Sequence, residues 1–142
     1  MITNQSGIGR GRLTWAQVEV VNARLRDLLA MEGVSLDGVY ACPHRDDERC
    51  DSRKPGDHLA RQATPGLGLS LNQAVVVGDK PADLGLARRL GVLGFLVTTG
   101  YGAATLAHGG VAADYVMDGL DDVARICSHP AGLAVATALP AS

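Results

Sequence analysis

Apolar residues recur at helical spacing early in the chain and gather into short runs further along it. Between residues 15 and 32 they fall three or four positions apart, at Val18, Val21, Leu25, Leu28 and Leu29. This spacing predicts an amphipathic helix over residues 15–32. Thr14 and Gln17 have the pattern of a capping box at its start, and Gly33 is placed to end it.

Short apolar runs then alternate with further helical segments. The predicted strands cover residues 1–3, 38–41, 74–77, 92–97 and 115–117, and the other predicted helices cover residues 57–64, 81–90 and 120–126. Pro81 and Gly91 mark the two ends of one helix, whereas Pro65 is expected to end another. Residues 4–12 are expected to form a glycine-rich loop. The alternation predicts an α/β fold with a parallel, doubly wound, Rossmann-like sheet.

Length and composition fit one domain. A chain of 142 residues can bury its own core, and aromatic residues make up 4% of it, so the core must be mainly aliphatic. The sequence shows neither a repeat nor a linker. We therefore expect one domain over residues 1–128 and a loose tail over residues 129–142.

The net charge and the number of cysteines limit which binding partners and which cellular location are expected. A net charge of -2 favours neither nucleic acid nor an anionic membrane surface as a partner. No apolar run reaches the roughly 20 residues of a membrane span. Three cysteines do not suggest a disulfide framework, so a reducing cytoplasm is the simplest expected location.

Lysine is scarce, with two residues against eleven arginines. Lys54 lies in a Ser-Arg-Lys-Pro segment, and Lys80 follows a Gly-Asp pair at the end of the predicted strand 74–77. A compact ammonium with three donors suits a single phosphate oxygen, while the arginine side chain is a broad planar fork. The two positions therefore indicate phosphate chemistry.

The segment around Lys80 also carries carboxylates. Asp79 follows an apolar strand, and open α/β sheets bind ligands at the carboxyl ends of their strands. Mg²⁺ binds through one or two carboxylates together with phosphate and water, which makes Asp79 a candidate ligand with Asp83 in support. The alternative is that Asp79 or Asp83 is a solvated cap of the following helix. The opening segment, Thr3, Asn4 and Gln5, offers hydroxyl and amide groups that can hold a phosphoryl group.

A second cluster has the residue types of a zinc site. Cys42, His44 and Cys50 supply two thiols and an imidazole, and structural zinc sites usually have four such ligands. Ser52 stands where a fourth thiolate would complete the set. The alternative is a polar loop with two free thiols, and Cys127 is expected to lie in the core.

Taken together, these segments resemble the haloacid dehalogenase (HAD) superfamily of phosphatases. More narrowly, they resemble the D-glycero-D-manno-heptose 1,7-bisphosphate 7-phosphatase group. The segments that carry the resemblance are residues 3–11, 40–44, 53–56, 77–83 and 97–102, in the order and spacing of that group. The resemblance therefore covers about residues 1–102, and the remainder is compatible with the same fold.

The resemblance implies Mg²⁺-dependent hydrolysis of a sugar phosphate through an aspartyl-phosphate intermediate. It implies that Asp79 binds Mg²⁺ with support from Asp83, and that Lys54 holds the phosphoryl group and the nucleophile. The residues that it places at the phosphate and the sugar are Thr3, Asn4, Gln5, Arg10, Arg53 and Lys80.

One motif of that group is missing from the sequence. The Asp-x-Asp-x-Thr segment, which carries the nucleophile and the general acid on the middle strand of the sheet, should precede Thr3, and the sequence contains no Asp-x-Asp. We expect either that the natural protein begins further upstream and is a complete phosphatase, or that it is an inactive relative that binds a phosphosugar or a metal. A sheet that lacks this strand would expose unpaired edges, which makes self-association possible.

Overall fold

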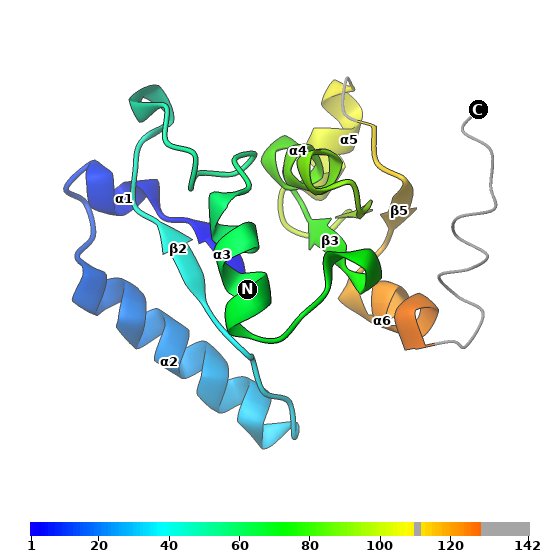
Figure 1. Cartoon of the computed structure of the whole chain (residues 1–142), viewed down its shortest axis with the longest axis horizontal. Helices are drawn as coiled ribbons and strands as arrows, with labels where there is room; N and C mark the ends of the chain where they lie inside the picture. Colours follow the sequence, from blue (N-terminus) through cyan, green and yellow to red (C-terminus); the bar gives the residue numbers. More distant parts are fainter. Residues whose placement is uncertain (110–111, 129–142) are drawn as a thin grey trace. The chain divides into compact units, whose positions relative to one another are not determined.

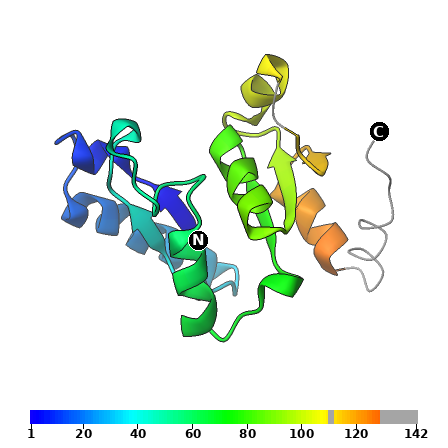
Figure 2. The same ribbon diagram turned by 45° about the horizontal axis from the view of Figure 1, so that its top comes forward.

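The computed structural model describes residues 1–109 and 112–128, so the predicted tail over residues 129–142 lies outside the described part. The chain divides into two compact units, Met1–Gln73 and Ala74–Ser142. Figures 1 and 2 show the elements of each unit. No described helix has both the length and the apolar character needed to cross a membrane.

The first unit is a parallel strand pair with helices beside it. Its elements are β1 (Ile2–Asn4), α1 (Ser6–Gly9), α2 (Trp15–Met31), β2 (Tyr40–Cys42), the 3-10 turn η1 (Asp46–Glu48), α3 (His58–Gly66) and the 3-10 turn η2 (Leu71–Gln73). Strands β1 and β2 run parallel, with Thr3 opposite Ala41. Helices α2 and α3 flank this pair in both views (Figures 1 and 2). Trp15, the sole tryptophan, begins α2 and is 53% exposed.

The second unit is a three-stranded parallel sheet with the order β3-β4-β5. Its elements are β3 (Val75–Gly78), α4 (Pro81–Leu90), β4 (Leu93–Val97), α5 (Gly102–His108), β5 (Tyr115–Met117) and α6 (Leu120–Ser128). The parallel pairing of all the described strands confirms the predicted α/β fold class.

Different helices pack on the two faces of β4. Successive side chains of a strand point to opposite faces, so neighbouring residues of β4 contact different helices. A side chain at Gly94 would meet α4, since a Cβ added there would lie 3.0 Å from the Cβ of Ala87. Phe95 and Val97 point the other way and form the core with Val123 of α6. The Phe95 ring is fully buried and stacks on Tyr115, with the ring centroids 4.9 Å apart.

Several predicted boundaries were wrong. The loop predicted over residues 4–12 contains the one-turn helix α1, and α5 was not predicted at all. Helix α3 does not stop before Pro65 but continues to Gly66. A proline so close to the end of a helix interrupts little, because few later residues depend on the helical hydrogen bonds there.

The described strands form two sheets and not the single sheet that the sequence predicts. Among the described residues, β1 pairs only with β2 and β3 pairs only with β4. Strands β1 and β3 therefore each present one edge without a described neighbour.

Candidate functional site

The turn between β3 and α4 places Asp79, Lys80 and Asp83. A Cβ on Gly78 would lie 2.3 Å from the Cβ of Asp83, so glycine is required there to let the Asp83 side chain approach the strand. The Oδ2 atom of Asp83 accepts a hydrogen bond from the backbone N–H of Lys80 at 3.0 Å. Asp83 thus caps α4, but it is 5% exposed and not the solvated cap considered from the sequence.

Asp79 is oriented by the segment that leads into α5. The backbone N–H of Tyr101 donates to Asp79 Oδ2 at 2.9 Å, and the Thr105 hydroxyl donates to the Asp79 carbonyl oxygen at 2.8 Å. Gly100 adopts a φ of +61°, and a Cβ there would lie 2.4 Å from Asp79 Oδ2. The half-buried carboxylate at the end of β3 therefore has a defined direction.

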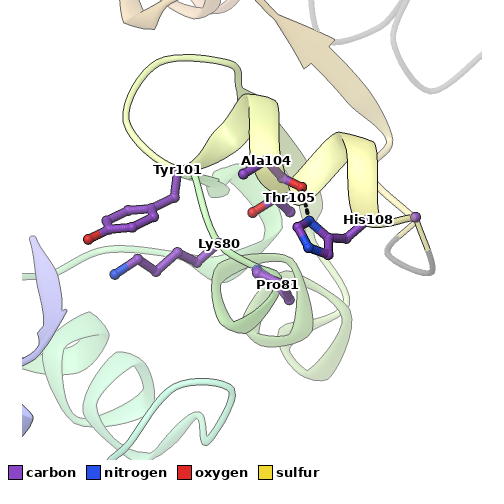
Figure 3. A pocket seen from close by; sticks show the side chains of 7 residues that line it. Lys80, Pro81, Tyr101, Ala104, Thr105 and His108 are labelled. Atoms are coloured by element: carbon purple, nitrogen blue, oxygen red, sulfur yellow. Dashed lines mark hydrogen bonds between the residues drawn. The ribbon is translucent and has the colours of Figure 1, made fainter.

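Lys80 is exposed, and its ammonium lies over the ring of Tyr101, with Nζ 4.2 Å from the ring centroid. Figure 3 shows these two side chains running side by side at the rim of an open pocket. The pocket has a volume of about 260 Å³ and is lined by Lys80, Pro81, Tyr101, Ala104, Thr105, His108 and Gly109. Its walls are mostly apolar, with the Lys80 ammonium as the cationic group at the rim.

In the first unit, the end of β1 is joined to the loop that carries Lys54. The Asn4 amide donates to the Lys54 carbonyl at 3.1 Å, and the Asn4 side-chain oxygen accepts from the Lys54 backbone N–H at 2.9 Å. Lys54 Nζ donates to the Ile2 carbonyl at 2.8 Å. Thr3 and Gln5 lie beside this contact, where Gln5 Nε2 donates to Thr3 Oγ1 at 3.2 Å.

The two candidate arginines have partners within the first unit. Arg10 forms a 2.6 Å ion pair with Asp46, and both side chains are well exposed. Arg53 donates to the carbonyl oxygen of His44 at 3.2 Å. An exposed pair such as Arg10 with Asp46 is weak, so it can be exchanged for a pair with a phosphate.

Cys42, His44 and Cys50 converge, with all three ligand atoms within 4.8 Å of one another. Cys42 Sγ lies 3.6 Å from His44 Nδ1 and 3.9 Å from Cys50 Sγ. Zinc–ligand bonds of about 2.3 Å to sulfur and about 2.0 Å to nitrogen imply tetrahedral edges of about 3.5–3.8 Å. The two distances from Cys42 Sγ therefore match the edges of a tetrahedral zinc site.

The two thiols of this cluster differ in acidity. Burial is the main cause that raises the pKa of the Cys42 thiol, and the neighbouring Cys50 adds to it. Burial also acts to raise the pKa of Cys50, but hydrogen bonds from Ser52 and Cys42 outweigh it and lower that pKa. Ser52, at the position of the expected fourth ligand, thus assists the neighbouring thiolate.

Sequence reasoning missed the roles of Tyr101 and Thr105, the two residues that hold Asp79. Tyr101 is 63% exposed, so burial would not have singled it out. The two glycines that flank it are the signal that could have pointed to a tightly placed backbone.

Comparison with known proteins identifies the family. Residues 52–123 match the HAD-hydrolase-like family. The D-glycero-beta-D-manno-heptose-1,7-bisphosphate 7-phosphatase of Pseudomonas putida is 39% identical over 123 residues, covering 87% of this chain and 70% of the relative. The enzyme of the same name from Bordetella bronchiseptica is 33% identical over 134 residues, covering 94% of this chain and 70% of the relative.

Two solved structures share the fold. The crystal structure of D,D-heptose 1,7-bisphosphate phosphatase from B. bronchiseptica, complexed with magnesium and phosphate, gives a TM-score of 0.80 at 34% identity. The match covers 87% of this chain and 70% of that one. A HAD-like phosphatase structure from Mesorhizobium loti gives a TM-score of 0.71 at 28% identity, over 95% of this chain and 66% of that one.

The fold and the motif segments define a hydrolase-type domain of the HAD superfamily. Within that superfamily, the chain belongs to the family of D-glycero-D-manno-heptose 1,7-bisphosphate 7-phosphatases.

Proposed function

We propose that the protein acts in the Mg²⁺-dependent hydrolysis of a sugar phosphate, with D-glycero-D-manno-heptose 1,7-bisphosphate as the substrate. The observation that carries this proposal is the oriented Asp79 carboxylate at the carboxyl end of β3, held by the Tyr101 N–H at 2.9 Å. The names of the relatives and the magnesium and phosphate in the B. bronchiseptica structure support the choice of ion and substrate.

Asp79 fits a magnesium ion because its carboxylate supplies a hard oxygen in a fixed direction. Asp83 supports the site indirectly, since it holds the Lys80 amide and thereby the turn that carries Asp79. When bound, the ion would neutralise phosphoryl oxygens. Arg53 and Lys80 supply positive charge for the rest of the substrate, and Arg10 does so after exchanging its partner Asp46.

In the first unit, Lys54 is the cation proposed to hold the phosphoryl group. The paired hydrogen bonds between Asn4 and the Lys54 backbone fix the loop from which this ammonium projects. The hydroxyl of Thr3 and the amide of Gln5, with the amide of Asn4, are the proposed donors to the phosphoryl oxygens. A partly buried amide pair of this kind positions the cation without adding charge of its own.

We further propose a structural zinc ion at Cys42, His44 and Cys50, with an oxygen ligand in the fourth position. The spacing of the three ligand atoms supports it. The described cysteines are all free thiols, which suits a reducing cytoplasm. Metal analysis of protein purified without added metal should give one equivalent of zinc, and Cys42→Ser should abolish it; zinc-free wild-type protein would contradict the proposal.

A second candidate is a binding protein without turnover. The observation in its favour is that the sequence has no Asp-x-Asp, the family's source of the nucleophile and general acid. We therefore expect the 142-residue chain to bind Mg²⁺ and phosphate while releasing little phosphate from heptose bisphosphate.

The test uses the full chain and two matched variants. Calorimetric titration with Mg²⁺ in the presence of inorganic phosphate should show binding that Asp79→Asn weakens by about tenfold or more. Asp27→Asn, an exposed change on α2, should leave that affinity unchanged. Rapid phosphate release that Asp79→Asn abolishes would favour the enzyme over the binding protein, whereas a chain that binds neither ion would refute both.

A further inference from the structure

Tyr101 contacts two consecutive residues of the candidate site in different ways. Its ring lies under the Lys80 ammonium at 4.2 Å, and its backbone N–H binds the Asp79 carboxylate at 2.9 Å. The backbone on either side is tightly constrained. Gly100 has a φ of +61°, and a Cβ on Gly102 would lie 1.7 Å from the Val97 carbonyl oxygen. The ring therefore projects from a fixed point.

The Lys80 ammonium needs a contact such as the Tyr101 ring if its position is to be fixed. It is exposed, and a lysine side chain has a flexible four-carbon stem whose ordering costs rotamer entropy. An ammonium within about 6 Å of a ring face is attracted by the ring quadrupole. Because Lys80 is exposed, an ammonium held by the ring on one side can still meet an anion from solvent.

We propose that Tyr101 is a positioning residue that holds the Lys80 ammonium where it meets an anionic group of the substrate. The inference rests on the proposed function in one respect, which is that Lys80 binds phosphate. Through the same residue, the placement of this cation is tied to the direction of the Asp79 carboxylate. Tyr101 touches no reacting atom in this scheme and acts through its two neighbours.

The competing explanation is that the ring only forms one wall of the pocket in Figure 3. In that case, the position of Lys80 and its affinity for anions would not depend on the ring. The two explanations differ in one measurable property, the coupling between residues 80 and 101.

The lysine content makes this coupling accessible to NMR, because the chain has only two lysines. In full-length protein with isotope-labelled lysine, Lys80→Met assigns the signals by removing one set. The ring current of Tyr101 should shift the Lys80 methylene protons upfield relative to those of Lys54. Tyr101→Phe should keep that shift and Tyr101→Leu should remove it, while Leu106→Ala, an exposed change on α5, should not alter it.

The same samples, titrated with inorganic phosphate in the presence of Mg²⁺, test the consequence. Tyr101→Leu should weaken phosphate binding by about two- to fivefold, the effect of an exposed cation–π contact. Tyr101→Phe should bind phosphate with the affinity of the wild type. In protein that already carries Lys80→Met, Tyr101→Leu should not weaken phosphate binding further.

Three results would overturn the inference. The first is a Lys80 signal that does not respond to Tyr101→Leu, which would refute the contact whatever the protein's activity. The second is equal weakening by Tyr101→Leu with and without Lys80, which would show a merely structural role. The third is phosphate affinity unaffected by Lys80→Met, which would remove the proposed role of Lys80 itself. Circular dichroism of each variant verifies that it is folded.

Discussion

Replacing Gly100 with alanine should damage the proposed Mg²⁺ site through a single added methyl group. Its φ of +61° disfavours any L side chain, at a cost of about 1 kcal/mol. The added Cβ would also lie 2.4 Å from Asp79 Oδ2, so the carboxylate must move by about 1 Å to reach ordinary contact distance. That movement breaks the 2.9 Å hydrogen bond from Tyr101, because bonds of this kind do not persist much beyond about 3.2 Å.

The magnitude follows from these two effects. A hydrogen bond to a charged group contributes about 1.5 kcal/mol at the lower end of its range, which applies here because Asp79 is only half-buried. Gly100→Ala should therefore lower the free energy of unfolding by about 2.5 kcal/mol. Because the carboxylate is displaced, Mg²⁺ binding in the presence of phosphate should weaken by about tenfold or more.

Gly91→Ala is the matched control. Gly91 ends α4 with a φ of +69°, and a Cβ there would meet no atom within 4 Å. It should therefore lose only about 1 kcal/mol of stability and keep its Mg²⁺ affinity. Urea unfolding followed by circular dichroism gives the first quantity and calorimetry the second. Equal stability losses in the two variants, with Mg²⁺ binding intact in both, would refute the reasoning.

Three further predictions concern the core, the Lys54 loop and the cysteine cluster. Phe95→Ala should lower the free energy of unfolding in urea by about 3–5 kcal/mol, because the ring is fully buried; a loss below about 1 kcal/mol would contradict this. Asn4→Ala removes both hydrogen bonds to the Lys54 backbone and should speed hydrogen exchange of the Lys54 amide; unchanged exchange, measured by NMR, would count against it. Thiolates form as the pH rises, so the lowered pKa of Cys50 and the raised pKa of Cys42 mean that iodoacetamide should label Cys50 at lower pH in metal-free protein. Peptide mass spectrometry measures the labelling of each cysteine, and labelling of Cys42 at lower pH than Cys50 would contradict this prediction.

The sequence predicted correctly those features that depend only on residues close together in the chain, such as helix caps. The predicted capping box is present, with the Thr14 hydroxyl accepting from the Gln17 N–H at 3.2 Å and the Gln17 side chain accepting from the Thr14 N–H at 2.8 Å. Helix α4 begins at Pro81 and is capped by Gly91 as predicted. These signals are reliable because the partners lie within one turn of each other.

Contacts between distant segments could not be predicted in this way. Asp79 and Tyr101 lie 22 positions apart, and the parallel pairing of β3 with β4 brings the segments that follow these strands together. Helix α5 itself has the sequence Gly-Ala-Ala-Thr-Leu-Ala-His, which carries no apolar period and begins with a poor helix former. Tertiary contacts stabilise this helix, so the helix propensities of its residues did not predict it.

The candidate residues of the first unit show the same division. Sequence alone named Asn4 and Lys54, but the reciprocal bonds between them span 50 positions and became visible only in three dimensions. The ion pair of Arg10 with Asp46 was likewise not predicted. The residue types identified the candidate site residues, whereas the hydrogen bonds and ion pairs between them depended on how the loops pack.

The placement of the aromatic residues separates the optical signals of the two units. The sole tryptophan, Trp15, lies in the first unit and is already 53% exposed, so its emission should change little when the chain unfolds. The stacked rings of Phe95 and Tyr115 lie in the second unit, where near-ultraviolet dichroism detects their fixed asymmetric packing. A melting curve recorded by tryptophan emission alone would therefore be blind to the loss of the half that carries Asp79, and near-ultraviolet dichroism is the probe that follows the melting of that half.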